Sequence, residues 1–343
     1  MRQSARTTRF EGALVSAPSA RPSRRHLLTG SAGLALAASA ASLVSPPRAA
    51  AAEPKSAALY PLKPTHLLEA ETLVEYLRLR TNPWDHNRYN VETDGRTLGR
   101  TTVTWGRPGH PEEFENLSQC ASFMTLLLER AYGADTAYGW ATSSYFDQYF
   151  PTKGAPAGTT RTGTYPTAED LQAGFLGASA VPHFDPVTKP VNLRPGDIVA
   201  WDKDPDEKTV PYTGHTVMIR AYLGTYASSV DGKLGIPGVV PHLFQVVDCT
   251  DNPHGGPDLA SQTSIDRYRA YPDTRAELSD DNATWTQHNG VGYGHMVFYA
   301  DPGTGLFVGY RWSLNSSQPY PAVAQAVDGK RQIAAGRVNA FVV

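Results

Sequence analysis

The residue best placed for covalent chemistry is Cys120, one of only two cysteines in a chain of 343 residues. It lies at the start of a predicted helix, where unpaired amide groups and the helix dipole favour an anion. A free thiol has a pKa near 8.5, and a helix N-terminus together with a histidine lowers that value. The same amides can hold the oxyanion that forms when a thiolate attacks a carbonyl. Cys120 is therefore the candidate nucleophile.

The helix that carries this cysteine is predicted from capping residues and periodicity. Asn116 and Gln119, three residues apart, form a variant of the capping box, and Gly133 ends the helix. The apolar positions at helical spacing are Cys120, Phe123, Leu127 and Ala131. Gln119 is an oxyanion candidate, unless its side chain closes the capping box.

The base and the residue that orients it are sought on the strands that follow. His215 begins a predicted strand directly after Gly214, and Asp248 ends the next predicted strand. A carboxylate at that position can accept one ring N–H of His215, leaving the other nitrogen for the thiol. We expect Cys120, His215 and Asp248 to form a catalytic triad.

Two members of this triad, Cys120 and His215, have alternatives. Two cysteines in an exported protein predict, in the simplest case, a structural disulfide between Cys120 and Cys249. If they are not bonded, Cys249 should point to the face opposite Asp248, because neighbouring strand residues alternate. His295 also begins a strand after a glycine, but the strand after it offers no carboxylate, so we rank it below His215. His215 itself could be a polar strand residue without a role.

Helices come early in the chain and neighbouring strands come late, which is typical of an α+β fold. Helices are predicted from Thr65 to before Asn82, across the Cys120 segment, at 144–150 and from Thr167. A tight turn at 194–197 leads into the first of several strands, predicted at 198–201, 215–219, 243–248, 295–300, 306–312 and 340–343, with one short strand earlier at 103–105. A Gly-rich insertion separates the strands of His215 and Asp248.

Three short segments in this order resemble a known superfamily. They are Gln119-Cys-Ala-Ser-Phe123 at a helix start, Arg194-Pro-Gly-Asp-Ile-Val-Ala-Trp201, and Gly214-His-Thr-Val-Met-Ile219. Together they are similar to the NlpC-type and CHAP-type branch of papain-like cysteine peptidases and amidases, over about residues 112 to 250. The resemblance implies a papain-like core with the nucleophile helix packed on an antiparallel sheet, and it implies cleavage of amide bonds in cell-wall peptides. Asp-Cys-Ser-Gly is usual in NlpC-type members, so Gln119-Cys-Ala-Ser122 is closer to CHAP usage.

The first fifty residues have the composition of an export signal. Arg24 and Arg25 precede a short Ala-rich apolar run that ends near Ala52, an order typical of the twin-arginine route. The run is shorter than the roughly 20 residues that span a bilayer, so we expect no membrane anchor after cleavage. We expect a cleaved signal at 1–52, an N-terminal helix and linker at 53–111, and a papain-like domain at 112–343 that has a long insertion and a C-terminal hairpin. The mature protein would be secreted, periplasmic or associated with the cell wall.

Composition and motifs exclude several other functions. A net charge of −2 disfavours nucleic-acid binding, which needs a basic face. The chain contains neither a Walker-type loop nor a Gly-x-Gly-x-x-Gly turn after a strand, and we expect no cofactor. Asp251, His254 and Asp258 share a Gly- and Pro-rich loop, but their spacing matches no zinc or calcium pattern, so we expect no metal site.

These observations predict an exported cysteine hydrolase that acts on cell-wall peptide or another amide substrate. Cys120 would attack the carbonyl, His215 would transfer the proton, and Asp248 would orient His215. Two alternatives stay open: an acyltransferase that uses the same site, and a secreted binding or structural domain with a Cys120–Cys249 disulfide.

Overall fold

The structure is a computed structural model that describes residues 63–91, 98–153, 163–203, 214–325 and 329–340. The expected export signal at 1–52 lies outside these residues, as do the last three positions of the strand expected at 340–343. The described residues belong to one compact unit. None of the helices in the described part of the chain is long and apolar enough to cross a membrane.

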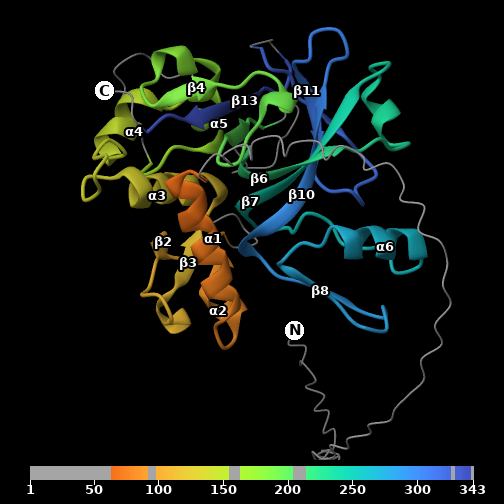
Figure 1. Ribbon diagram of the computed structural model, residues 1–343, viewed down its shortest axis with the longest axis horizontal. Helices are drawn as coiled ribbons and strands as arrows, with labels where there is room; N and C mark the ends of the chain where they lie inside the picture. Colours follow the sequence, from red (N-terminus) through yellow and green to blue (C-terminus); the bar gives the residue numbers. More distant parts are fainter. Residues whose placement is uncertain (1–62, 92–97, 154–162, 204–213, 326–328, 341–343) are drawn as a thin grey trace, which may run out of the picture. The chain divides into compact units, whose positions relative to one another are not determined.

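A sheet of eight strands forms the centre of the described unit (Figure 1). All of its neighbouring strands are antiparallel. Their spatial order is β12 (Tyr320–Pro321), β11 (Phe307–Arg311), β10 (Gly290–Ala300), β7 (Val240–Thr250), β6 (His215–Thr225), β5 (Ile198–Trp201), β13 (Ile333–Val338) and β4 (Phe184–Pro186). The described strands outside this sheet are short.

Six α-helices accompany the sheet in the described residues: α1 (Thr65–Arg78), α2 (Pro83–His86), α3 (Cys120–Tyr132), α4 (Ser143–Tyr149), α5 (Ala168–Leu176) and α6 (Gln262–Ala270). Short 3-10 helices are η1 (Pro111–Glu113), η2 (Ala178–Ala180), η3 (Pro190–Asn192) and η4 (Asp231–Leu234). The predicted α+β class is therefore confirmed.

Two small sheets complete the described elements. The first has the order β1 (Asn87–Tyr89), β3 (Glu115–Ser118) and β2 (Thr102–Thr104), with β1 parallel to β3. The second is the hairpin of β8 (Ala276–Leu278) and β9 (Trp285–Gln287). In the first sheet Tyr89 pairs with Ser118, two residues before Cys120, so β1 lies beside the start of α3.

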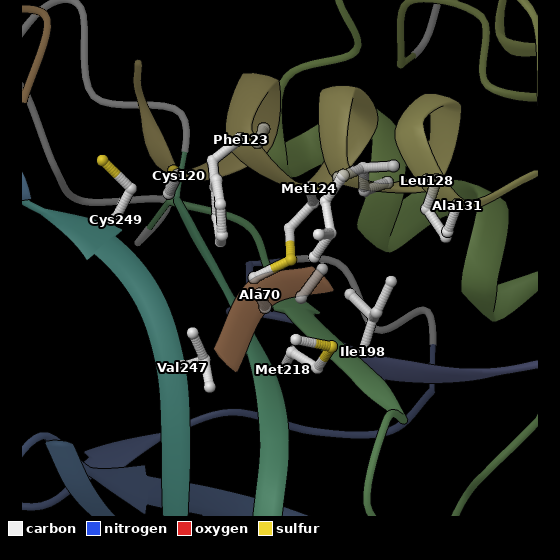
Figure 2. Packing of buried hydrophobic residues seen from close by; sticks show 14 of the residues in the cluster. Ala70, Cys120, Phe123, Met124, Leu128, Ala131, Ile198, Met218, Val247 and Cys249 are labelled. Carbon is white, nitrogen blue, oxygen red and sulfur yellow. The ribbon is translucent and has the colours of Figure 1, made fainter. Parts of the chain in front are cut away.

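The helix α3 packs one apolar face on the sheet. Figure 2 shows Phe123, Met124 and Leu128 on the helix facing Met218 and Val247 on the strands. These side chains are at most 1% exposed. Burial of a side chain of this size contributes about 2 kcal/mol, so the core holds the first turn of α3 firmly against the ends of β6 and β7.

The predicted start of α3 was wrong. The helix begins at Cys120 and its N-cap is Gln119, whereas Asn116 lies in β3. Asn116 is buried, and its side-chain amide donates to the side chain of Asn87 on the neighbouring β1, so it serves the small sheet and does not cap the helix. Cys120 is thus the first residue of the helix, closer to its positive end than the sequence indicated.

The strands of His215 and Asp248 are longer than predicted. Both have 11 residues, so they take up part of the presumed insertion and leave the connection 226–239 between them. Two glycines shape the approach to β6. Gly196 has φ +92° in the turn that precedes β5, and Gly214 has φ +97° directly before His215. A Cβ at Gly214 would lie 2.0 Å from the carbonyl oxygen of Trp201, so only glycine fits there.

The first helix belongs to the same hydrophobic core as α3. Its buried face is Leu67, Ala70, Leu73, Val74 and Leu77. The buried His66 ring joins it to two other elements, through a 2.8 Å contact with the hydroxyl of Tyr132 and a 2.7 Å contact with the carbonyl oxygen of Gly196. The helix is therefore an integral part of the domain.

We predict that Leu73→Ala lowers the free energy of unfolding by about 3 kcal/mol, because it opens a cavity in a fully buried site. Leu68→Ala is the matched control on the same helix, since Leu68 is 48% exposed. Urea unfolding of both variants measures the difference. Equal stability of the two variants would mean that α1 is not packed on the core.

Candidate active site

The imidazole of His215 is held by a buried carboxylate. Its Nε2 lies 2.7 Å from Oδ2 of Asp248, and the two side chains are 7% and 0% exposed. His215 is the first residue of β6 and Asp248 lies on the neighbouring β7, so the sheet fixes their separation. The pairing leaves Nδ1 of His215 as the nitrogen that can meet a thiol.

Cys120 meets this histidine. Its sulfur shares a hydrogen bond with the His215 side chain and accepts the backbone N–H groups of Thr216 and Ala121. Cys120 and His215 are 6% and 5% exposed. The structure therefore brings together the three residues that the sequence singled out, at the point where the first turn of α3 meets the start of β6.

The two groups shift each other's proton affinity. Burial raises the pKa of the Cys120 thiol, but the charge and hydrogen bond of His215 and the amides of Thr216 and Ala121 outweigh it, and the net pKa is lowered. Burial lowers the pKa of His215, but the charge of Cys120 together with the hydrogen bond that His215 donates to Asp248 raises it to about 10. Both shifts favour a thiolate–imidazolium pair at neutral pH.

A tyrosine from β1 also reaches the sulfur. The Tyr89 hydroxyl is hydrogen bonded to Cys120, and burial followed by the nearby charges of Cys120, Cys249 and Asp251 raises its pKa well above the ordinary value. The hydroxyl therefore keeps its proton and can donate it to an anion. The sequence does not predict a role for Tyr89, because residues 82–115 contain no motif and are only polar and rich in turn residues.

Gln119, the predicted oxyanion residue, is partly engaged elsewhere. Its side-chain Nε2 donates to the carbonyl oxygen of Asn90 at 3.2 Å. Its backbone N–H donates to Oγ of Ser122 at 2.9 Å, which closes the N-terminus of α3. Its role toward an oxyanion stays a prediction, whereas the Tyr89 side chain is hydrogen bonded to the sulfur.

The two cysteines are free thiols in different environments. Cys249 points away from Asp248, as strand alternation predicted, and its sulfur donates to the carbonyl oxygen of Ser118 at 3.2 Å. Burial raises the pKa of Cys249 to about 12. The expected alternative of a Cys120–Cys249 disulfide is therefore not favoured.

Behind the carboxylate lies a second set of charges. Nη1 of Arg275 donates to Oδ1 of Asp248 at 2.9 Å, while its Nε and Nη2 donate to the two carboxylate oxygens of Asp273 at 2.9 and 2.8 Å. Arg275, Asp248 and Asp273 are all at most 2% exposed. Burial raises the pKa of Asp248, but the charge of Arg275 and its neighbours hold it well below the ordinary value. Nothing in the sequence around Arg275 indicated this contact.

The other candidate residues from the sequence, His295 and the loop 251–258, do not contact the Cys120 sulfur in any hydrogen bond that the structure describes. His295 is buried on β10 with its ring centroid 5.5 Å from that of Tyr271, and burial lowers its pKa to about 4. His254 faces Asp248, whereas Asp251 and Asp258 are exposed. In the described residues, the one group of three His, Asp or Glu side chains close enough to share an ion is His110, Glu112 and Glu113, on the surface and away from the predicted loop.

Comparisons of this chain with protein-family models, with curated proteins and with solved structures find no significant match. The chemistry of the site is therefore derived from its own residues. A lowered thiol pKa, a raised imidazole pKa, an oriented base and a protonated tyrosine form a constellation suited to nucleophilic attack on a carbonyl.

We predict that iodoacetamide alkylates Cys120 rapidly at about pH 6, where an ordinary thiol is almost wholly protonated. The alkylation rate should fall only when the pH drops below the lowered pKa of Cys120, because the sulfur stays a thiolate at every pH above that pKa. Peptide mass spectrometry of the native protein measures both sites, and Cys249 is the internal control that should stay unmodified. Alkylation of Cys120 that rises only above about pH 8.5 would contradict the ion pair.

Proposed function

We propose that this protein is an exported cysteine hydrolase that cleaves amide bonds, with cell-wall peptide as the favoured substrate. The observation that carries the proposal is the hydrogen bond between the Cys120 sulfur and His215, whose other nitrogen lies 2.7 Å from a buried carboxylate. A helix that bears the cysteine and packs on an antiparallel sheet supports a papain-like core. The paired arginines near the N-terminus and the resemblance to NlpC-type and CHAP-type enzymes support export and the wall substrate.

Acylation begins with attack of the Cys120 thiolate on the amide carbonyl carbon. A carbon–sulfur bond forms and the π electron pair moves onto the carbonyl oxygen. When the pair returns, the carbon–nitrogen bond breaks and the leaving nitrogen takes the proton of His215. The products of this step are a thioester on Cys120, a free amine and a neutral imidazole.

Water completes the cycle. His215 removes a proton from the water as its oxygen attacks the thioester carbonyl, and the collapse of the second tetrahedral intermediate breaks the carbon–sulfur bond. The carboxylic acid product leaves, and the thiolate and imidazolium are restored. Asp248 keeps the His215 ring in one orientation throughout, because its Oδ2 accepts from Nε2.

The oxyanion needs donors beside the sulfur. We assign this role to the backbone N–H of Cys120, which as the first residue of α3 has no partner within the helix, and to the Tyr89 hydroxyl. The amide comes from α3, which carries the sulfur, and the Tyr89 hydroxyl contacts that sulfur from β1. The tetrahedral oxygen would form about 3 Å from each.

We predict that Cys120→Ala lowers the release of amines from purified wall fragments by at least about 10³-fold, since no other group replaces the nucleophile. Cys249→Ala is the matched control: it removes the other buried thiol, and its rate should stay close to that of the parent protein. Activity of Cys120→Ala equal to the parent would rule out the proposed reaction.

Tyr89→Phe should reduce kcat by roughly 10²-fold with little change in KM, because the hydroxyl serves the transition state more than the bound substrate. Tyr222→Phe on β6 removes a partly exposed hydroxyl far along the same sheet and serves as the control. Steady-state kinetics on a peptide substrate measure both variants. An unchanged kcat in Tyr89→Phe would leave the oxyanion to the α3 amide alone.

A further inference from the structure

A second histidine, His254, contacts the same carboxylate oxygen as His215. Its Nε2 lies 3.1 Å from Oδ2 of Asp248, and its Nδ1 lies 2.7 Å from the carbonyl oxygen of Trp312. The side chain of His254 is 0% exposed, so water does not compete for either nitrogen. Gly294 on β10 makes room for the His254 ring, since a Cβ at this position would lie 2.2 Å from the ring.

Both partners of His254 are acceptors. A backbone carbonyl has no proton to give, and Asp248 is held ionised by Arg275. Neutral imidazole has a single N–H, so one of the two contacts would then set a nitrogen lone pair against an oxygen. Only the doubly protonated ring donates to both oxygens. The indole of Trp312 lies over the ring at 4.1 Å between centroids and 31° between planes, a position that favours a cation.

Charge balance leads to the same protonation state. The buried group behind the catalytic pair contains two carboxylates, Asp248 and Asp273, and one guanidinium, Arg275. A net buried charge is costly unless it is matched. A positive His254 supplies the second cation, and it leaves the Cys120–His215 pair as a separate neutral unit.

We infer that His254 is an imidazolium and a second positioning residue of the Cys120 site, which holds Asp248 in place and limits how strongly that carboxylate retains the proton of His215. The inference rests on the proposed cysteine hydrolase function. His254 and His215 both donate to the same oxygen of Asp248, so each hydrogen bond weakens the other. The positive charge of His254 also opposes that of His215, which makes the latter a better proton donor to the leaving amine.

The groups that face His254 come from four parts of the chain. They are Asp248 on β7, His215 on β6, His295 on β10, and Asp273 with Arg275 in the segment directly before β8. Oδ2 of Asp273 accepts the backbone N–H of His254 at 2.7 Å, which fixes the loop that carries it. Burial followed by the charge of His254 lowers the pKa of His295, so this ring stays neutral and adds no cation.

The test is nitrogen NMR of the histidine rings in the full mature protein, without substrate. At about pH 7.5 we expect both nitrogens of His254 to be protonated in the parent protein. In His254→Gln, which keeps a neutral donor but no charge, His215 should lose its proton at a pH roughly one higher than in the parent protein. His242→Gln, which changes a buried histidine at the far end of β7, should leave His215 unchanged.

Kinetics provide the second readout. His254→Gln should lower kcat by about tenfold and leave KM unchanged. In a plot of kcat against pH, the alkaline limb should shift to higher pH. A neutral His254 ring in the parent spectrum would overturn the inference, and this spectrum needs no variant to fold. A protonated His254 whose replacement moves neither His215 nor kcat would also overturn it. Failure of the proposed function would instead be seen as slow alkylation of Cys120 in the parent protein, whatever the state of His254.

Discussion

The Asp248 carboxylate is the constraint on which the site depends. It is fully buried on β7. One of its oxygens makes hydrogen bonds with His215 and His254, and the other accepts a hydrogen bond from Arg275. A buried carboxylate is tolerated only when it is hydrogen bonded and charge matched, so its three partners must be present together. His215 comes from β6, His254 from the loop after β7 and Arg275 from the segment before β8. Together they hold the His215 ring in one orientation toward the sulfur.

The rest of the fold serves this geometry. Core packing of α3 on β6 and β7 sets where Cys120 begins its helix, and Gly214 lets β6 start so close to β5 that His215 faces the cysteine. The small sheet of β1, β3 and β2 brings Tyr89 to the same place. Residues far apart in the sequence thus meet at a single sulfur atom, whose thiolate is favoured by an imidazolium on one side and by backbone amides on the other.

Much of this site was predictable from sequence, since a cysteine at a helix start, a histidine at a strand start and an aspartate on the next strand are local patterns. The α+β class followed from the order of helices and strands. Tyr89, Arg275 and the contact of His254 with Asp248 were not predictable, because each depends on long-range packing across segments without a motif. The sequence indicates only that His254 lies in a loop, since the close approach that Gly294 permits leaves no periodic signal in the sequence.

The most direct test of the account is the ultraviolet absorbance of the thiolate, followed from acid to mildly alkaline pH in the parent protein and in Cys249→Ala. The account predicts that both show thiolate absorbance already at about pH 6, and that Cys120→Ala lacks it. Thiolate absorbance that first appears above about pH 8.5 in the parent would show an ordinary thiol and would contradict the ion pair with His215.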